Sequence, residues 1–143
     1  MKNSTTKPGI SFWVIGIIAL LWNIMGVMEY LSTAYMTEET LQTFTKGEQD
    51  FYNNTPTYIT AAFAIAVFAG ALGCIALLLR KKFASTLFIL SLIAVFVQFG
   101  YILLIQNFME ISGVRLIMPL LIILVAIFLA WYSKKAYLKN ILS

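Results

Sequence analysis

The stretch FWVIGIIALLWNIMGVM, Phe12–Met28, decides the fold of this chain. Its 17 residues carry no charge, Asn23 is its one strongly polar side chain, and Glu29 closes it. An apolar run of this length approaches the roughly 20 residues that cross the hydrocarbon core of a bilayer as a helix. Three more apolar runs follow along the chain. The sequence therefore predicts an all-α integral membrane protein, a four-helix transmembrane bundle.

The predicted spans form a single domain over 1–143. They cover about 11–35, 57–80, 83–106 and 114–132, and an outer loop occupies 36–56. In this loop Thr37 precedes two acids, a pattern typical of a helix N-terminus. We therefore expect one short helix there, lying on the membrane surface and ending near Gly47. Pro119 either starts the fourth helix or kinks it.

Small and polar residues recur at helical spacing in three of the spans, which is how membrane helices approach one another closely. The first-span stripe is Phe12, Gly16, Ala19, Asn23, Gly26 and Tyr30; the second-span stripe is Ala62, Ala66, Gly70 and Cys74; the third-span stripe is Ala84, Leu87, Ser91, Ala94, Gln98 and Tyr101. These stripes should face the interior of the bundle. The second span should be the most buried.

The composition agrees with lipid as the main solvent. Of 143 residues, 61% are hydrophobic and 11% are charged, whereas about a quarter of a soluble domain is charged. The chain has no His and one Cys, which excludes an internal disulfide and His-ligated metal or haem. It also contains no phosphate-binding loop or catalytic triad. We expect no enzyme, no cofactor and no metal, and we interpret Cys74 as a packing residue.

The charges divide between the two ends of the spans. Lys2, Lys7, Arg80, Lys81, Lys82, Lys134, Lys135 and Lys139 fall on one side, while all six acids, Lys46 and Arg115 fall on the other. Short loops rich in Lys and Arg remain cytoplasmic. Both termini should therefore be cytoplasmic and the long loop external. The net charge of +4 thus reflects topology, not nucleic-acid binding.

A group of polar side chains in the outer half of the bundle forms the candidate site. It comprises Asn23, Glu29, Tyr30, Gln98, Tyr101 and Arg115. One interpretation is a pocket open to the outside, because amides and phenols bind neutral or hydroxyl-rich solutes. In the other, Asn23 and Gln98 bond each other or the backbone across helices, and Glu29 and Arg115 form an ion pair or are solvated separately.

Several segments also resemble a known group of proteins. ALLWNIMGVMEYL, YNNTPTYITAAFAIAVFAGALG, LLLRKKFASTLFILSLIAVFVQ and FLAWYSKKA are similar to small bacterial four-span proteins commonly labelled sugar transporters, which share the general layout of DoxX-like proteins. The resemblance implies four helices in the bacterial inner membrane and transport of a small solute.

Two functions therefore stand as hypotheses. The first is a homo-oligomeric transporter of a small neutral or polyhydroxylated solute, since known transporter folds combine repeated units. The second is a non-catalytic accessory or scaffold subunit of a larger membrane complex, because small-residue stripes and short loops suit helix packing. Both have the lipid bilayer as a partner.

Overall fold

The computed structural model describes residues 7–105, 116–139 and 141–142 of the chain, and the regular structure in these ranges is helical. In chain order the elements are α1 (Ile10–Ala34), α2 (Glu38–Gln42), α3 (Lys46–Asn54), α4 (Thr57–Leu78), α5 (Phe83–Gly100), the π-helical segment η1 (Tyr101–Ile105) and α6 (Ile117–Leu138). The all-α prediction is confirmed.

Four helices in the described ranges are long and apolar enough to cross a membrane: α1, α4, α5 continued by η1, and α6. The chain is thus consistent with a multi-pass membrane protein. The fourth helix continues to Leu138, six residues beyond the predicted 132. It continues because Lys134 and Lys135 do not interrupt helical hydrogen bonding, and Lys135 in the last turn interacts favourably with the negative helix end.

Pro119 lies in the first turn of α6, which begins at Ile117. Amide groups of a first helical turn have no acceptor within the helix, so the missing N–H of proline breaks no hydrogen bond there. Of the two alternatives, the structure therefore has Pro119 at the start of the α-helix instead of at a kink.

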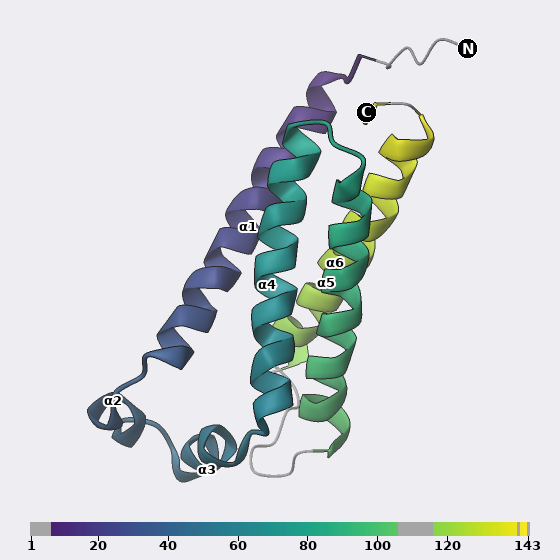
Figure 1. The fold of residues 1–143 in the computed structure, drawn as a ribbon. Helices are drawn as coiled ribbons and strands as arrows, with labels where there is room; N and C mark the ends of the chain where they lie inside the picture. The colour runs from purple at the N-terminus through teal and green to yellow at the C-terminus, as the bar shows by residue number, and fades with distance from the viewer. Residues whose placement is uncertain (1–6, 106–115, 140, 143) are drawn as a thin grey trace.

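The four long helices stand side by side in the order α1, α4, α5, α6 (Figure 1). α1 begins, and α6 ends, at the same end of the bundle as the turn between α4 and α5. This is called the basic end here, because Arg80, Lys81, Lys82 and the Lys134–Lys139 segment lie there. The opposite, acidic end carries α2 and α3.

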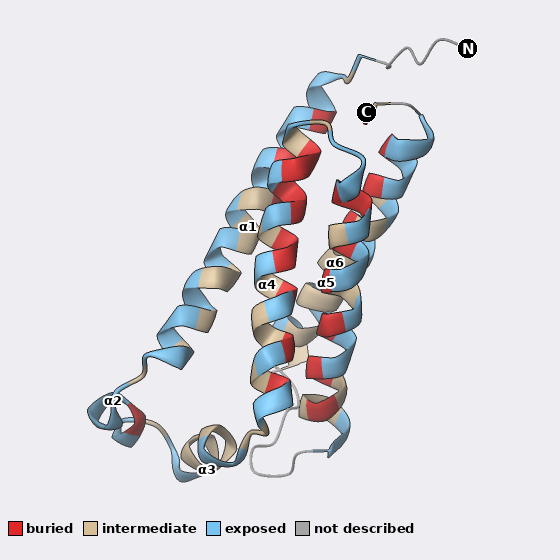
Figure 2. Cartoon of the chain, in the orientation of Figure 1, coloured by how far each residue is buried: buried red, intermediate tan, exposed pale blue. Residues whose placement is uncertain are grey.

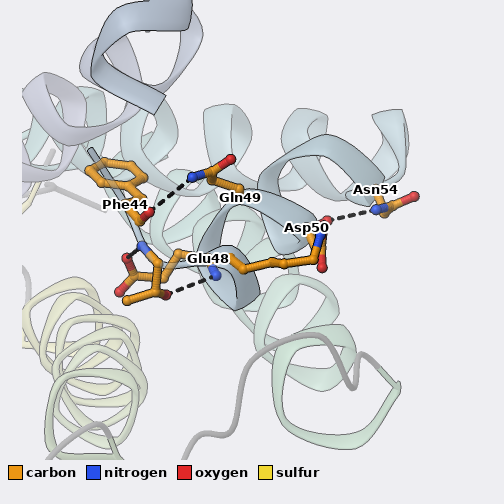
Figure 3. Close-up of polar contacts among 7 residues, drawn as sticks. Phe44, Glu48, Gln49, Asp50 and Asn54 are labelled. Carbon is orange, nitrogen blue, oxygen red and sulfur yellow. Dashed lines mark hydrogen bonds and ion pairs between the residues drawn. The ribbon is translucent and has the colours of Figure 1, made fainter. Parts of the chain in front are cut away.

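The loop at the acidic end holds two short helices where the sequence predicted one. The Thr37 hydroxyl accepts a hydrogen bond from the Thr40 backbone amide, so the predicted cap of α2 is confirmed. Gly47 does not end this helix; it lies inside α3. The reason is a capping box that starts a new helix at this point (Figure 3). The Glu48 backbone amide donates to the Thr45 hydroxyl, and the Thr45 backbone amide donates to the Glu48 carboxylate.

α4 is the most buried span, as predicted, and α1 is the least buried (Figure 2). Most residues of the predicted stripes are buried: Phe12, Gly16 and Ala19 of α1, Ala62, Ala66, Gly70 and Cys74 of α4, and Ala84, Ser91, Ala94, Gln98 and Tyr101 of the α5–η1 span. The remaining stripe residues, Asn23, Gly26, Tyr30 and Leu87, are half-buried. Because apolar side chains face lipid without loss, burial in this protein marks helix contact and not apolar character.

The core differs between the two ends. Near the basic end all four long helices contribute, and the rings of Phe12 in α1 and Tyr132 in α6 lie 6.4 Å apart between centroids. The second cluster, built on Ala94, Val95 and Phe99, draws on α4, α5, η1 and α6 but not on α1. α1 therefore belongs to the common core only toward the basic end.

Glycines allow α1 and α4 to approach closely. A Cβ atom at Gly16 would lie 2.5 Å from Leu78 Cδ2, and one at Gly26 would lie 3.0 Å from Val67 Cγ1. The tightest position is Gly70 of α4, where a Cβ atom would overlap the Asn23 side-chain oxygen at 2.1 Å. The contact between the two helices is thus set by the absence of a side chain at Gly70.

We predict that Gly70→Ala destabilises the protein by about 1–3 kcal/mol, because Asn23 must leave its position to admit the methyl group. Thermal unfolding in detergent measures this. Gly100→Ala is the matched control: a Cβ atom there meets nothing within 4 Å, and the change should be neutral or slightly stabilising. Equal melting temperatures for the two variants would contradict the close contact.

Candidate functional site

Asn23 is held in the contact between α1 and α4. Its amide nitrogen donates hydrogen bonds to the Ala19 carbonyl oxygen at 2.9 Å and to the Cys74 sulfur at 3.4 Å. Its oxygen lies directly over Gly70. The amide nitrogen of this side chain is therefore bonded within the protein, and its oxygen is packed against backbone.

Ser91 brings α5 to the same place. Its hydroxyl donates a 2.6 Å hydrogen bond to the Ala66 carbonyl oxygen of α4, and its oxygen lies 3.3 Å from where a Gly70 Cβ would be. We call Asn23, Gly70, Cys74 and Ser91 the central polar layer. Contacts of this kind between membrane helices contribute roughly 0.6 kcal/mol each, up to about 2. The layer joins α1, α4 and α5, which favours the packing interpretation for Asn23.

Gln98 lies two turns beyond Ser91 on α5 and differs from Asn23. Its side chain is 8% exposed, and within the described residues no hydrogen bond joins its amide to another protein group. No side-chain nitrogen or oxygen among those residues is both fully sealed and unpartnered. The Gln98 amide is therefore not fully sealed within the described part of the chain. The structure does not join Asn23 and Gln98 by a hydrogen bond.

Tyr101 is buried and begins η1, the π-helical continuation of α5. Its ring lies 6.5 Å from that of Phe51 in α3, measured between centroids. π-Helical turns are rare and occur frequently at functional sites. Gln98 of α5, Tyr101 of η1 and Phe51 of α3, together called the acidic-end site here, place an amide, a phenol and an aromatic ring from three elements in one region.

Tyr30 is a packing residue of the contact between α1 and α4. Its ring meets those of Phe63 and Phe68 edge to face, with centroid distances of 5.4 and 5.8 Å. Edge-to-face pairs of this kind contribute about 0.5–1.5 kcal/mol beyond the burial of their area. The ring contacts of Tyr30 in the described chain are thus with α4 and not with α5.

Glu29 is exposed and lies near α3, where its charge acts on Tyr52. Burial, followed by the negative charges of Glu29 and Glu48, raises the pKa of the Tyr52 phenol above its usual value. The phenol is therefore held in its neutral, hydrogen-bonding form. Arg115, the sixth candidate, lies outside the described residues, and so does its expected pairing with Glu29.

The sequence did not indicate that α3 would contribute to the site. α3 is fixed locally by its capping box, by the Gln49 amide bonded to the Phe44 carbonyl at 2.9 Å, and by the Asn54 amide bonded to the Asp50 carbonyl at 2.8 Å (Figure 3). An exposed 3.7 Å ion pair, Lys46–Asp50, lies on the same helix. Capping residues predict such a helix, but no local pattern predicts that Phe51 reaches Tyr101.

Comparison with known protein families, with characterised proteins and with solved structures finds no match for this chain. Function must therefore be argued from the site itself. Among residues 7–105, 116–139 and 141–142, no three His, Cys, Asp or Glu side chains gather as a metal-ligand group. The chemistry that the described site offers is hydrogen bonding and aromatic contact.

The Asn23 and Gln98 side chains should respond differently to removal of their amide groups. We predict that Asn23→Leu destabilises the protein by about 1–3 kcal/mol, because it breaks two hydrogen bonds and places a branched side chain over Gly70. Gln98→Leu, which breaks no hydrogen bond within the described protein, should change stability by less than about 1 kcal/mol. Thermal unfolding of both variants in one detergent makes the comparison, and equal losses would contradict the distinction.

Proposed function

We propose that this protein binds a small neutral, hydroxyl-rich solute at the acidic-end site and carries it across the membrane. The observation that supports this most strongly is the Gln98 side chain, which is 8% exposed and has no hydrogen-bond partner among the described residues. A polar group at this depth in a membrane helix is expensive unless it is bonded, and such groups mark sites by default.

The chemistry of the site supports a neutral ligand. The Gln98 amide both donates and accepts hydrogen bonds, the Tyr101 hydroxyl does the same, and the Phe51 ring offers an apolar face. The acids whose charges act on the neighbouring Tyr52, Glu29 and Glu48, are on α1 and α3 and are not among these three side chains. Alternating hydroxyl groups and C–H faces, as in a sugar or polyol, fit this combination.

Of the other predicted site residues, Asn23 and Tyr30 take supporting roles in this proposal. Both hold α1 against α4, through the central polar layer and through aromatic contacts. Glu29 lies close enough to α3 for its charge to act on Tyr52. In this proposal the solute contacts α5, η1 and α3.

The proposed location is the bacterial cytoplasmic membrane, with both termini inside. The support is the division of charge: the described acids lie at or near the acidic end, and the short turn and tail at the opposite end are rich in Lys and Arg. In this orientation the acidic-end site faces outward, and α2 and α3 lie at the outer surface. A solute would enter from outside the cell.

A homo-oligomer is part of the proposal, because four helices in a row leave two open sides. α1 and α6 are the least buried of the four spans. Known transporters place the substrate between two repeated units. A second copy of the chain would supply the other wall of the pathway.

The central polar layer favours a second candidate, a non-catalytic scaffold subunit. Asn23 is bonded inside the protein, and the exposed apolar faces of α1 and α6 offer two surfaces for other membrane helices. Stoichiometric recovery of one partner protein in mild detergent, without solute binding by the purified chain, would favour the scaffold over the transporter.

The test of transport uses the purified full chain in liposomes with radiolabelled hexoses and polyols. We predict uptake that Gln98→Leu lowers about ten-fold, the effect of losing a buried hydrogen bond to the ligand. Gln42→Leu is the matched control, because it makes the same exchange on the exposed surface of α2 and should leave uptake unchanged.

Tyr101→Phe, compared with Tyr58→Phe at an exposed tyrosine, gives a second pair that removes only a hydroxyl group. Uptake that is absent in well-folded wild-type protein, or equal in all four variants, would overturn the proposal.

A further inference from the structure

The basic end of the bundle gathers two segments that lie far apart in the sequence. Arg80 Nε donates a 3.0 Å hydrogen bond to the Ile141 carbonyl oxygen, so the turn between α4 and α5 is tied to the C-terminal tail. Lys82 Nζ lies 5.2 Å from the centre of the Tyr137 ring near the end of α6. The turn and the last turns of α6 therefore form one surface, called the basic surface here.

The shape of this surface is fixed by backbone contacts. Arg80 adopts a left-handed conformation with φ 59°, and the amides of Arg80 and Lys81 donate to the Leu77 and Ala76 carbonyl oxygens at 2.9 and 2.8 Å. These bonds close the end of α4 and set the direction of the turn. On the other side, Leu142 is 1% exposed within the core cluster, so the tail is anchored beside the turn.

The charge of the basic surface is not balanced within the described chain. Lys81, Lys82, Lys134, Lys135 and Lys139 are all exposed. The described acids, Glu29, Glu38, Glu39, Glu48 and Asp50, lie at or near the other end of the bundle. Like charges held together in this way repel one another unless anions join them, so the surface is suited to an anionic partner.

Exposed aromatic side chains give the depth of this surface in a membrane. Trp131 and Phe83 are more than half exposed, and Lys135 Nζ lies 5.0 Å from the Trp131 ring. Tryptophan and tyrosine are enriched at the level of the lipid headgroups. The lysines of the basic surface therefore stand at the level of the phosphates, with apolar helix faces beside them for acyl chains.

We infer that the basic surface binds the phosphate of an anionic phospholipid between the Arg80–Lys82 turn and the last turns of α6. A phosphodiester supplies the negative charge, and the acyl chains lie along the exposed faces of α5 and α6. This site is at the opposite end from the acidic-end site and does not depend on solute transport. Clusters of Lys and Arg at this depth are a sequence-readable feature of anionic lipid recognition.

The experiment counts the lipids that the full chain retains when native mass spectrometry releases it from nanodiscs of equimolar phosphatidylglycerol and phosphatidylcholine. Wild-type protein should retain an excess of phosphatidylglycerol. Lys82→Gln and Lys135→Gln should each lower that excess about five-fold, the effect of one lysine near anionic lipid. Lys46→Gln, which removes one positive charge from α3 at the acidic end, should leave it unchanged.

Thermal unfolding checks that each variant is folded. If Lys82→Gln does not fold, Lys135→Gln alone tests the proposal. Retention of the two lipids in the proportion of the bilayer, or an equal effect of Lys46→Gln, would overturn the proposal.

A separate experiment adds millimolar inorganic phosphate to protein in nanodiscs of phosphatidylcholine alone. Saturable phosphate binding there, with loss of the lipid preference in the mixed nanodiscs, would assign the site to a free anion and also overturn it.

Discussion

The close contact of Asn23 with Gly70 is the constraint on which the arrangement of α1, α4 and α5 depends. Water drives no association between helices in lipid, so they join by close backbone approach and by polar groups that bond across the contact. Gly70 of α4 leaves space that the Asn23 side chain of α1 occupies, and the Ser91 hydroxyl of α5 lies beside the same position. One missing side chain on α4 thereby sets the positions of two neighbouring helices.

The polar side chains on the predicted stripes of α1 and α5 divide into two kinds. Asn23 and Ser91 have partners in the protein, and their role in holding helices together accounts for their presence. Gln98 has none among the described residues, and Tyr101 stands beside it at the start of a π-helical segment. Position in the bundle alone does not separate the two kinds, because all of these residues lie on inward-facing stripes. What separates them is whether the protein completes their hydrogen bonding.

The sequence predicted most of the architecture for a physical reason. Spacing of small residues along a membrane helix determines which face can approach another helix, so the spacing correctly predicted that Gly16, Gly70 and Ala84 lie on the inward faces of α1, α4 and α5. Span number followed from the length of apolar runs. The Thr37 cap was predicted because it depends only on its neighbours in the chain.

The features that the sequence did not predict depend on more distant contacts or on competing local signals. Gly47 was expected to stop a helix, but the Thr45–Glu48 capping box outweighs the modest helix penalty of one glycine. The change from α- to π-helix at Tyr101 has no signature in one sequence. The contact of Phe51 with Tyr101 joins residues 50 apart, so it emerges only when the chain is folded.

In the proposed transporter the Gln98 amide is reached from the outer solution, whereas Ser91 is enclosed by its contact with α4. Cysteine accessibility in intact membranes, on a Cys74→Ala background, tests this difference most directly. We expect a small, membrane-impermeant thiol reagent to modify the Gln98→Cys variant from the side that carries α2 and α3 and to leave the Ser91→Cys variant unmodified. Equal protection of both positions, or equal modification of both, would contradict it.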